Sequence, residues 1–204
     1  MNERAKQRLV ELGADRRRVQ WSAAASAAVA AGQPLSVTIC ITWSACIAAE
    51  QRSGHWLGLS EPERVKRLWD RLRRLARHHG VELFLAARAP EYDATKGTHL
   101  HLAIHLPDTA LRGVIELVQR VTGAPTERLH LPHGAVIRRA GRRLQGVLAL
   151  GDAGAWLIQK NTRPLIGGEQ GFLGYASKAP RSVMVQSQFR LSNDLVALTR
   201  LAAA

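Results

Sequence analysis

Three histidines alternate with apolar residues in the stretch KGTHLHLAIHLP, residues 96–107. The apolar positions share one parity and the histidines share the other: Leu100, Leu102, Ile104 and Leu106 against His99, His101 and His105. A period of two is typical of a β-strand with one buried face. The imidazoles are therefore predicted to line the opposite face of a sheet.

His99 and His101 are the pair that could hold a metal ion. Residues two apart on a strand lie about 6.5–7 Å from each other with parallel side chains, so two imidazoles can converge on one divalent ion. His105 lies about 13 Å from His101 along the strand and is out of reach of that ion. The alternative is a polar strand face that meets solvent or a helix.

A site with two histidines needs at least one further ligand, and Glu91 is the candidate. It precedes His99 by eight residues. A turn near residues 93–97 would make residues 81–89 and 96–107 an antiparallel hairpin. Such a hairpin brings the Glu91 carboxylate back beside the histidines. Otherwise, Glu91 is a solvated turn residue.

A second candidate constellation is Tyr175 with Lys178, in the stretch GGEQGFLGYASKA, residues 167–179. On a helix, residues three apart share a face, so the ammonium would stand next to the phenol. A cation there can neutralise a phosphate that a phenolate attacks. The spacing Tyr-x-x-Lys also arises often by chance.

The charge of the chain points to a polyanionic partner. Its 204 residues include 29 Lys+Arg against 16 Asp+Glu, a formal net charge of +13. Such a surface attracts nucleic acid, and the hydrophobic content of 46% excludes a disordered chain. The candidate phosphate contacts are arginines in two segments, 60–80 and 138–143: Arg64, Arg67, Arg71, Arg74, Arg138, Arg139, Arg142 and Arg143. For the first segment, the alternative is a solvated helix face.

Cysteine usage and hydropathy favour a cytoplasmic protein. The two cysteines, Cys40 and Cys46, have a spacing that matches neither a zinc site nor a redox pair, so we expect buried free thiols. No apolar run approaches the roughly 18 residues that a membrane span needs. We therefore expect no membrane partner.

The periodicity predicts an α+β fold, a central antiparallel β-sheet flanked by helices. Amphipathic helices are expected at 60–80 and 108–123, each ended by a glycine, with Asp108 as the N-cap of the second. Strands are expected at 35–43, 81–89, 96–107 and 182–189, and a last helix from about Asp194. Residues 1–32 are expected to be helical, and their alanine-rich part offers little bulk to bury.

Taken together, EYDATKGTHLHLAIHLP (residues 91–107), VTICIT (37–42) and the downstream Tyr-x-x-Lys resemble the motifs of HUH endonucleases, in particular rolling-circle replication initiators. The resemblance covers about residues 35–180. It implies that His99, His101 and Glu91 hold a divalent metal ion, Mg²⁺ or Mn²⁺. It also implies that Tyr175 is the nucleophile and that Lys178 supports the phosphate or positions the tyrosine.

The order of the motifs distinguishes the subfamilies. Conjugative relaxases place the tyrosine before the histidines, whereas here it follows them. Single-strand transposases of this type usually have a glutamine four residues before the tyrosine, where this chain has Gly171 and carries Gln170 one place off. A replication initiator with a single catalytic tyrosine fits better. A single-strand transposase, a non-catalytic basic DNA-binding protein and a zinc hydrolase stay open as alternatives.

The implied activity is nicking and rejoining of single-stranded DNA through a 5′-phosphotyrosine intermediate. The expected partner is single-stranded DNA, as an origin hairpin or a nick site. Because the sequence contains no helicase P-loop, unwinding would need a partner such as a host helicase, or a further C-terminal region. The expected organisation is a helical extension over 1–34, the nuclease domain over 35–180, and a C-terminal strand and helix over 181–204 that pack on the same domain.

Overall fold

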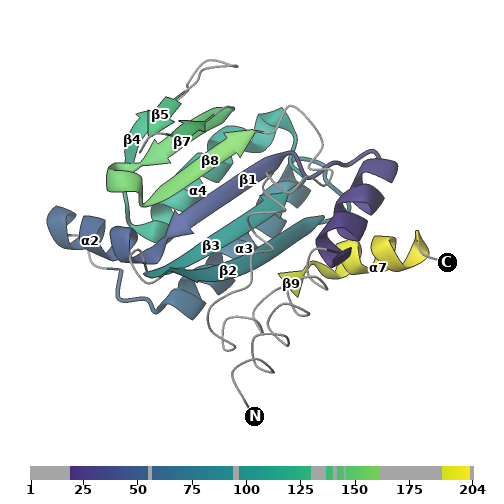
Figure 1. Cartoon of the computed structure of the whole chain (residues 1–204), viewed down its shortest axis with the longest axis horizontal. Coiled ribbons are helices and arrows are strands. Elements are labelled where there is room, and N and C mark those ends of the chain that lie inside the picture. The colour runs from purple at the N-terminus through teal and green to yellow at the C-terminus, as the bar shows by residue number, and fades with distance from the viewer. Residues whose placement is uncertain are drawn as a thin grey trace, which may run out of the picture.

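The computed structural model describes residues 19–54, 57–93, 97–129, 137–139, 142–144, 146–160 and 190–202. Within this part of the chain the fold is α+β, as the sequence predicts, with helices packed on an antiparallel sheet (Figure 1). No described helix has the length and apolar character needed to cross a membrane.

The main sheet has seven strands in the order β4-β7-β8-β1-β3-β2-β9, and every neighbouring pair is antiparallel. The strands are β1 (Val37–Thr42), β2 (Ala86–Asp93), β3 (Gly97–Ile104), β4 (Thr126–Leu129), β7 (Val147–Gly151), β8 (Trp156–Lys160) and β9 (Arg190–Leu191). A separate two-stranded sheet pairs β5 (Ile137–Arg139) with β6 (Arg142–Leu144). The histidine-bearing strand β3 thus lies inside the main sheet, between β1 and β2.

The described helices are residues 19–30, α2 (Trp43–Ser53), α3 (Glu61–His78), α4 (Leu111–Thr122) and α7 (Asn193–Leu201), with short 3₁₀ turns at Asp108–Ala110 and Asp152–Gly154. The start of α3 follows from its sequence: the Glu63 carboxylate accepts a hydrogen bond from the Ser60 backbone N–H at 2.8 Å, as in a capping box. At the end of α4, Gly123 has a φ of 70°, a conformation that favours glycine.

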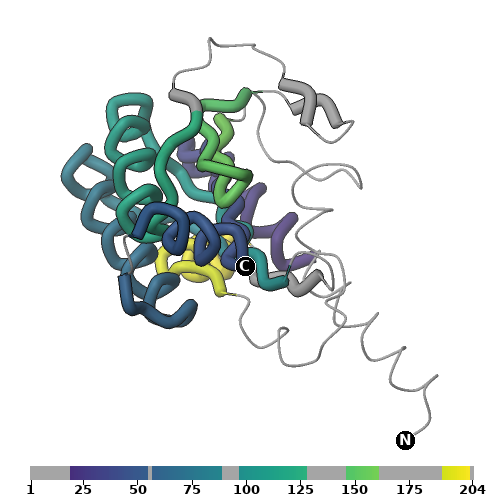
Figure 2. Tube along the Cα trace, turned by 90° about the vertical axis from the view of Figure 1, so that its left-hand side faces the viewer, coloured from purple at the N-terminus to yellow at the C-terminus, as the bar shows by residue number. Residues whose placement is uncertain are grey.

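Each face of the sheet has its own apolar cluster. On one face, Ile39 and Leu102 pack with Leu68 of α3 and Val118 of α4 in the larger cluster. On the other face, Ala87 and Ala103 pack with Trp21 of the 19–30 helix and Leu195 of α7. Figure 2 shows α3 and α4 side by side on one side of the sheet and the 19–30 helix on the other. The molecule therefore has helices on both faces.

Several boundaries differ from the sequence prediction. The strand expected at 81–89 begins at Ala86, because residues 81–85 bury Val81, Phe84 and Leu85 in a non-strand connection. Asp108 begins a 3₁₀ turn, and α4 starts only at Leu111. The alanine-rich helix is closely packed, with Trp21, Ala24 and Ala28 fully buried, because small side chains let its backbone approach the sheet. The strand expected at 182–189 lies outside the described residues.

Candidate metal and nucleic-acid site

The candidate site lies on the sheet face that carries the 19–30 helix. His99 and His101, which form the histidine row of β3, lie on the same face as Ala103, and Ala103 packs against that helix. Residues alternate between faces along a strand, so His99 and His101 lie opposite the buried Leu100 and Leu102. His101 is only 4% exposed, and His99 is half-buried. The predicted alternation is confirmed.

Both imidazoles are oriented by side chains of β1. The register pairs Thr42 with His99 and Cys40 with His101. Thr42 Oγ1 lies 3.1 Å from His99 Nδ1, and Cys40 Sγ lies 3.3 Å from His101 Nδ1. If each Nδ1 carries the proton, it donates to these groups, and Nε2 becomes the metal-binding nitrogen. Metal-bound histidines commonly have a second hydrogen bond of this kind.

Glu91 occupies the register position that a third ligand requires. The β2–β3 pairing sets Glu91 opposite His99 and Ala89 opposite His101. Directly paired residues of antiparallel strands belong to the same face, with Cβ atoms about 4.5–5.5 Å apart. The predicted hairpin is therefore present, and Glu91 belongs to β2 rather than to a turn. Its side chain lies outside the described part of the structure.

His105 has a structural role at the far end of the row. Its Nδ1 donates to the Pro34 carbonyl oxygen at 2.9 Å, and its backbone N–H donates to the Leu85 carbonyl oxygen. These bonds tie the end of β3 to the segments that precede β1 and β2. The sequence-based separation of His105 from the histidine pair agrees with this position.

The donor set of this site fits a divalent ion. Two imidazoles whose Nδ1 atoms contact a hydroxyl (Thr42) and a thiol (Cys40) would form a mixed N/O set with the carboxylate of Glu91. Mn²⁺ accepts such a set, whereas Mg²⁺ prefers oxygen ligands. Among the described side chains, no group of three His, Cys, Asp or Glu residues lies close enough to hold a metal ion. The proposed set needs Glu91, whose side chain is not among them.

The proposed nucleophile, Tyr175, and its partner, Lys178, both lie in the segment 161–189, outside the described residues. Their distance from the histidine row therefore stays a prediction.

The structure corrects the prediction that Arg64 contacts nucleic acid. It is 2% exposed, and its guanidinium forms a two-pronged ion pair with Glu50 of α2, with NH2 to Oε2 at 2.9 Å. It also donates to the backbone oxygens of Leu59 and Thr122, at 2.9 and 3.1 Å. All of its polar atoms face the protein because a buried guanidinium needs partners on every side. Arg64 therefore joins α2, α3 and α4 and cannot contact DNA.

The other predicted arginines fall into two groups. Arg67, Arg71 and Arg74 are exposed on α3, which covers the face of the sheet opposite the histidines. The second group pairs across the β5–β6 hairpin, as Arg138 with Arg143 and Arg139 with Arg142. The side chains of this second group lie outside the described part of the structure, so their contact with nucleic acid stays a prediction.

Sequence reasoning assigned no role to Thr42 and Cys40 and missed α2 entirely. The alternation of VTICIT places Thr42 and Cys40 on the polar face of β1, but only the register between β1 and β3 shows that they meet the histidines. The spacing of the buried Trp43, Cys46 and Ala49, followed by Gly54 with a φ of 67°, is the signal that could have revealed α2.

Comparison with known proteins adds no relative: no family model, no curated protein and no solved structure matches this chain.

Proposed function

We propose that the chain is a metal-dependent endonuclease and strand transferase of the HUH type that acts on single-stranded DNA, most simply as a rolling-circle replication initiator. The observation that carries the proposal is the register of three adjacent strands. β1 orients both imidazoles, β3 presents them in one row, and β2 sets Glu91 opposite His99. A polar strand face would need no such agreement among three strands.

In this proposal, His99, His101 and Glu91 hold Mg²⁺ or Mn²⁺. When bound, such an ion polarises the scissile phosphate and neutralises charge that develops on its oxygens. The Nδ1 contacts with Thr42 and Cys40 fix the ring orientations before DNA arrives, which lowers the reorganisation needed during the reaction.

In the proposed covalent step, Tyr175 is the nucleophile. The phenol gives up its proton, its oxygen forms a bond to phosphorus, and the bond from phosphorus to the 3′ oxygen of the preceding nucleotide breaks. The 3′ oxygen takes a proton and leaves as a hydroxyl, and the 5′ phosphate stays on the tyrosine. A phenol with an ordinary pKa near 10 is mostly protonated at pH 7, so Lys178 is assigned to favour the phenolate. Reversal rejoins the strand without ATP, because the phosphotyrosine retains a phosphodiester bond.

The arginine pairs of the β5–β6 hairpin and the net charge of +13 support binding to a DNA backbone. We place this activity in the cytoplasm, where the two free thiols stay reduced. A host helicase would then supply unwinding.

A covalent trapping assay tests the proposal. The protein is incubated with a pool of labelled single-stranded oligonucleotides and Mn²⁺ or Mg²⁺, and an SDS-resistant adduct is sought. Adduct formation should be lost in Tyr175→Phe and in EDTA. The matched control is Tyr92→Phe, which removes the only other tyrosine and should leave the adduct unchanged.

Metal binding is tested separately by titration calorimetry with Mn²⁺. The wild-type protein should bind one equivalent, and His99→Ala with His101→Ala should abolish that binding. An adduct that persists in Tyr175→Phe would overturn the nucleophile assignment. Manganese binding that survives the double histidine substitution would overturn the metal site. If DNA binding persists in a protein that neither binds metal nor forms an adduct, the non-catalytic DNA-binding alternative holds.

A further inference from the structure

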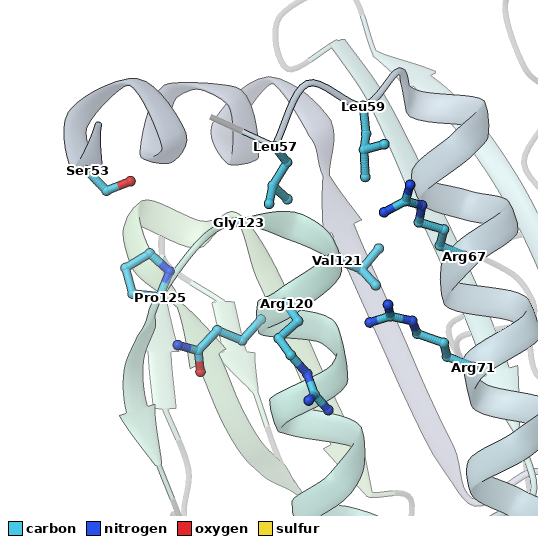
Figure 3. Close-up of a pocket in the computed structure, with 10 residues that line it drawn as sticks. Ser53, Leu57, Leu59, Arg67, Arg71, Arg120, Val121, Gly123 and Pro125 are labelled. Carbon is cyan, nitrogen blue, oxygen red and sulfur yellow. The ribbon is translucent and has the colours of Figure 1, made fainter. Parts of the chain in front are cut away.

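A cavity lies over α3 and α4, on the face of the sheet opposite the histidine row. It has a volume of about 520 Å³, is partly open to solvent, and is lined by the end of α2, the α2–α3 connection, α3 and the end of α4 (Figure 3). The residues that line it are Ser53, Leu57, Leu59, Arg67, Arg71, Gln119, Arg120, Val121, Gly123 and Pro125. The volume falls within the roughly 300–1,000 Å³ typical of small-molecule sites.

Three guanidinium groups line this cavity, and none of its lining residues is acidic. Arg67 and Arg71 are one turn apart on α3, so they share a face, and in Figure 3 both reach toward α4, which contributes Arg120. Glu63, one turn before Arg67, accepts hydrogen bonds from Ser60 N and Oγ at 2.8 and 2.6 Å. Arg120 also faces the negative end of α4, which offsets part of its charge. The Glu63 carboxylate also attracts Arg67, so part of the Arg67 charge is offset within α3, and the remaining positive charge of the three arginines is available to a ligand.

A buried ion pair beneath the cavity surface holds the helices that line it in place. The buried Arg64–Glu50 pair joins α3 to α2, and Arg64 donates to the Thr122 carbonyl oxygen at the end of α4. At Gly123, an added Cβ would lie 2.5 Å from Glu50 Oε1, so the chain passes directly over this pair. The pair fixes the three helix ends relative to one another. The cavity is therefore preformed rather than assembled by its ligand.

The cavity combines its three cations with an apolar side. Leu57, Leu59, Val121 and Pro125 form this side. Gln119 adds an amide whose Oε1 accepts a hydrogen bond from Thr126 Oγ1 at 3.1 Å and whose NH₂ group can donate to a base edge. Guanidinium groups bind phosphate oxygens in a two-pronged geometry and also stack on flat rings. A phosphate alone would use only the charged side. We propose that this cavity binds a nucleoside phosphate, either free or as one nucleotide of a single strand.

The site is separate from the proposed nuclease site. The apolar cluster that contains Leu68, Leu102 and Val118 lies between α3, α4 and the sheet, and the histidines lie on the far face of that sheet. A nucleotide bound between α3 and α4 cannot touch His99 or His101. The inference therefore does not depend on the nuclease proposal.

The test is titration calorimetry of the full chain with dATP, in EDTA so that no metal bridges the triphosphate to the histidine row. Arg67→Gln, Arg71→Gln and Arg120→Gln should each weaken dATP binding at least tenfold. The matched control is Arg77→Gln, which removes an exposed arginine of the same helix that does not line the cavity. It should change the affinity less than twofold. Because all four side chains are exposed, the variants should keep the wild-type melting temperature.

Two further titrations define the ligand. Tripolyphosphate should bind at least tenfold more weakly than dATP, because it lacks the nucleoside. Competition by a 12-nucleotide oligo-dT would identify the ligand as one nucleotide of a strand, and failure to compete would identify a free nucleotide. The proposal is overturned if dATP does not bind saturably, if Arg77→Gln weakens binding as much as Arg71→Gln, or if tripolyphosphate binds as tightly as dATP.

Discussion

The buried ion pair between Arg64 and Glu50 is predicted to be a main determinant of stability. Their side chains are 3% and 0% exposed, so neither charge is solvated. Glu50→Gln keeps the size of the side chain but leaves the guanidinium without a counter-charge. Breaking a buried pair from one side typically costs about 3–5 kcal/mol. For a chain of this size, that corresponds to a fall in melting temperature of roughly 6–20 °C.

The assay is urea unfolding at pH 7, followed by tryptophan fluorescence, for a double-mutant cycle. Arg64→Met with Glu50→Leu removes both charges together and should be destabilised by at least about 2 kcal/mol less than the sum of the single changes. Recovery will be incomplete, because the two carbonyl oxygens that Arg64 now satisfies lose their donor. The surface pair Arg112–Glu116 is the control, and Arg112→Gln should cost at most about 0.5 kcal/mol. Additive single changes, or a Glu50→Gln cost below about 1 kcal/mol, would refute this account of the pair.

Four further predictions concern titratable groups outside the site. Burial raises the pKa of the Cys46 thiol to about 12, so the thiol should react only when the protein unfolds. Its alkylation at pH 8, measured by mass spectrometry across a urea series, should therefore follow global unfolding. Fast alkylation in native buffer would contradict this prediction. Burial also raises the pKa of the Glu61 carboxyl, so its contribution to stability falls as pH rises from the ordinary value through the raised one, and Glu61→Gln should remove that decline between pH 4 and 7. The pH dependence has the opposite sign for Glu63, because hydrogen bonds from the capping serine Ser60 lower the pKa of its carboxyl. Its contribution to stability grows as pH rises, and Glu63→Gln should remove that increase. Equal pH profiles of stability for Glu61→Gln and Glu63→Gln would contradict both assignments. Arg190 is paired with Arg88 across the edge of the sheet, so Arg190→Glu should raise the free energy of unfolding by about 0.2–1 kcal/mol in urea titrations, whereas a decrease would show that the like charges are not in conflict.

Local patterns predicted the parts of the fold whose signal lies within one element. The strict alternation around His99 is readable because a half-buried strand repeats every two residues. The eight-residue separation from Glu91 likewise anticipated the hairpin, and the register between β2 and β3 confirms it.

The parts that sequence reasoning missed depend on contacts between distant segments. Arg64 looked like one more arginine on a solvated helix face, because nothing local marks it as buried. Its partner, Glu50, interrupts the apolar stripe of α2 and so concealed that helix as well. A charged residue can occupy the interior only when its partner comes from elsewhere in the fold. In the same way, the contacts of Thr42 with His99 follow from the pairing of β1 with β3, which no single strand specifies.

The cluster that closes the histidine face has a consequence for synthesis of the chain. Trp21 and Leu195 both pack there with Ala87 and Ala103. This face of the sheet is therefore covered by one segment from early in the sequence and one from late in it. On a ribosome that adds roughly 5–20 residues per second, Leu195 emerges about 90 residues after Ala103, a delay of roughly 5–18 s. During that interval the nascent sheet presents an apolar patch without α7, and chaperones that recognise such patches have their opportunity to bind.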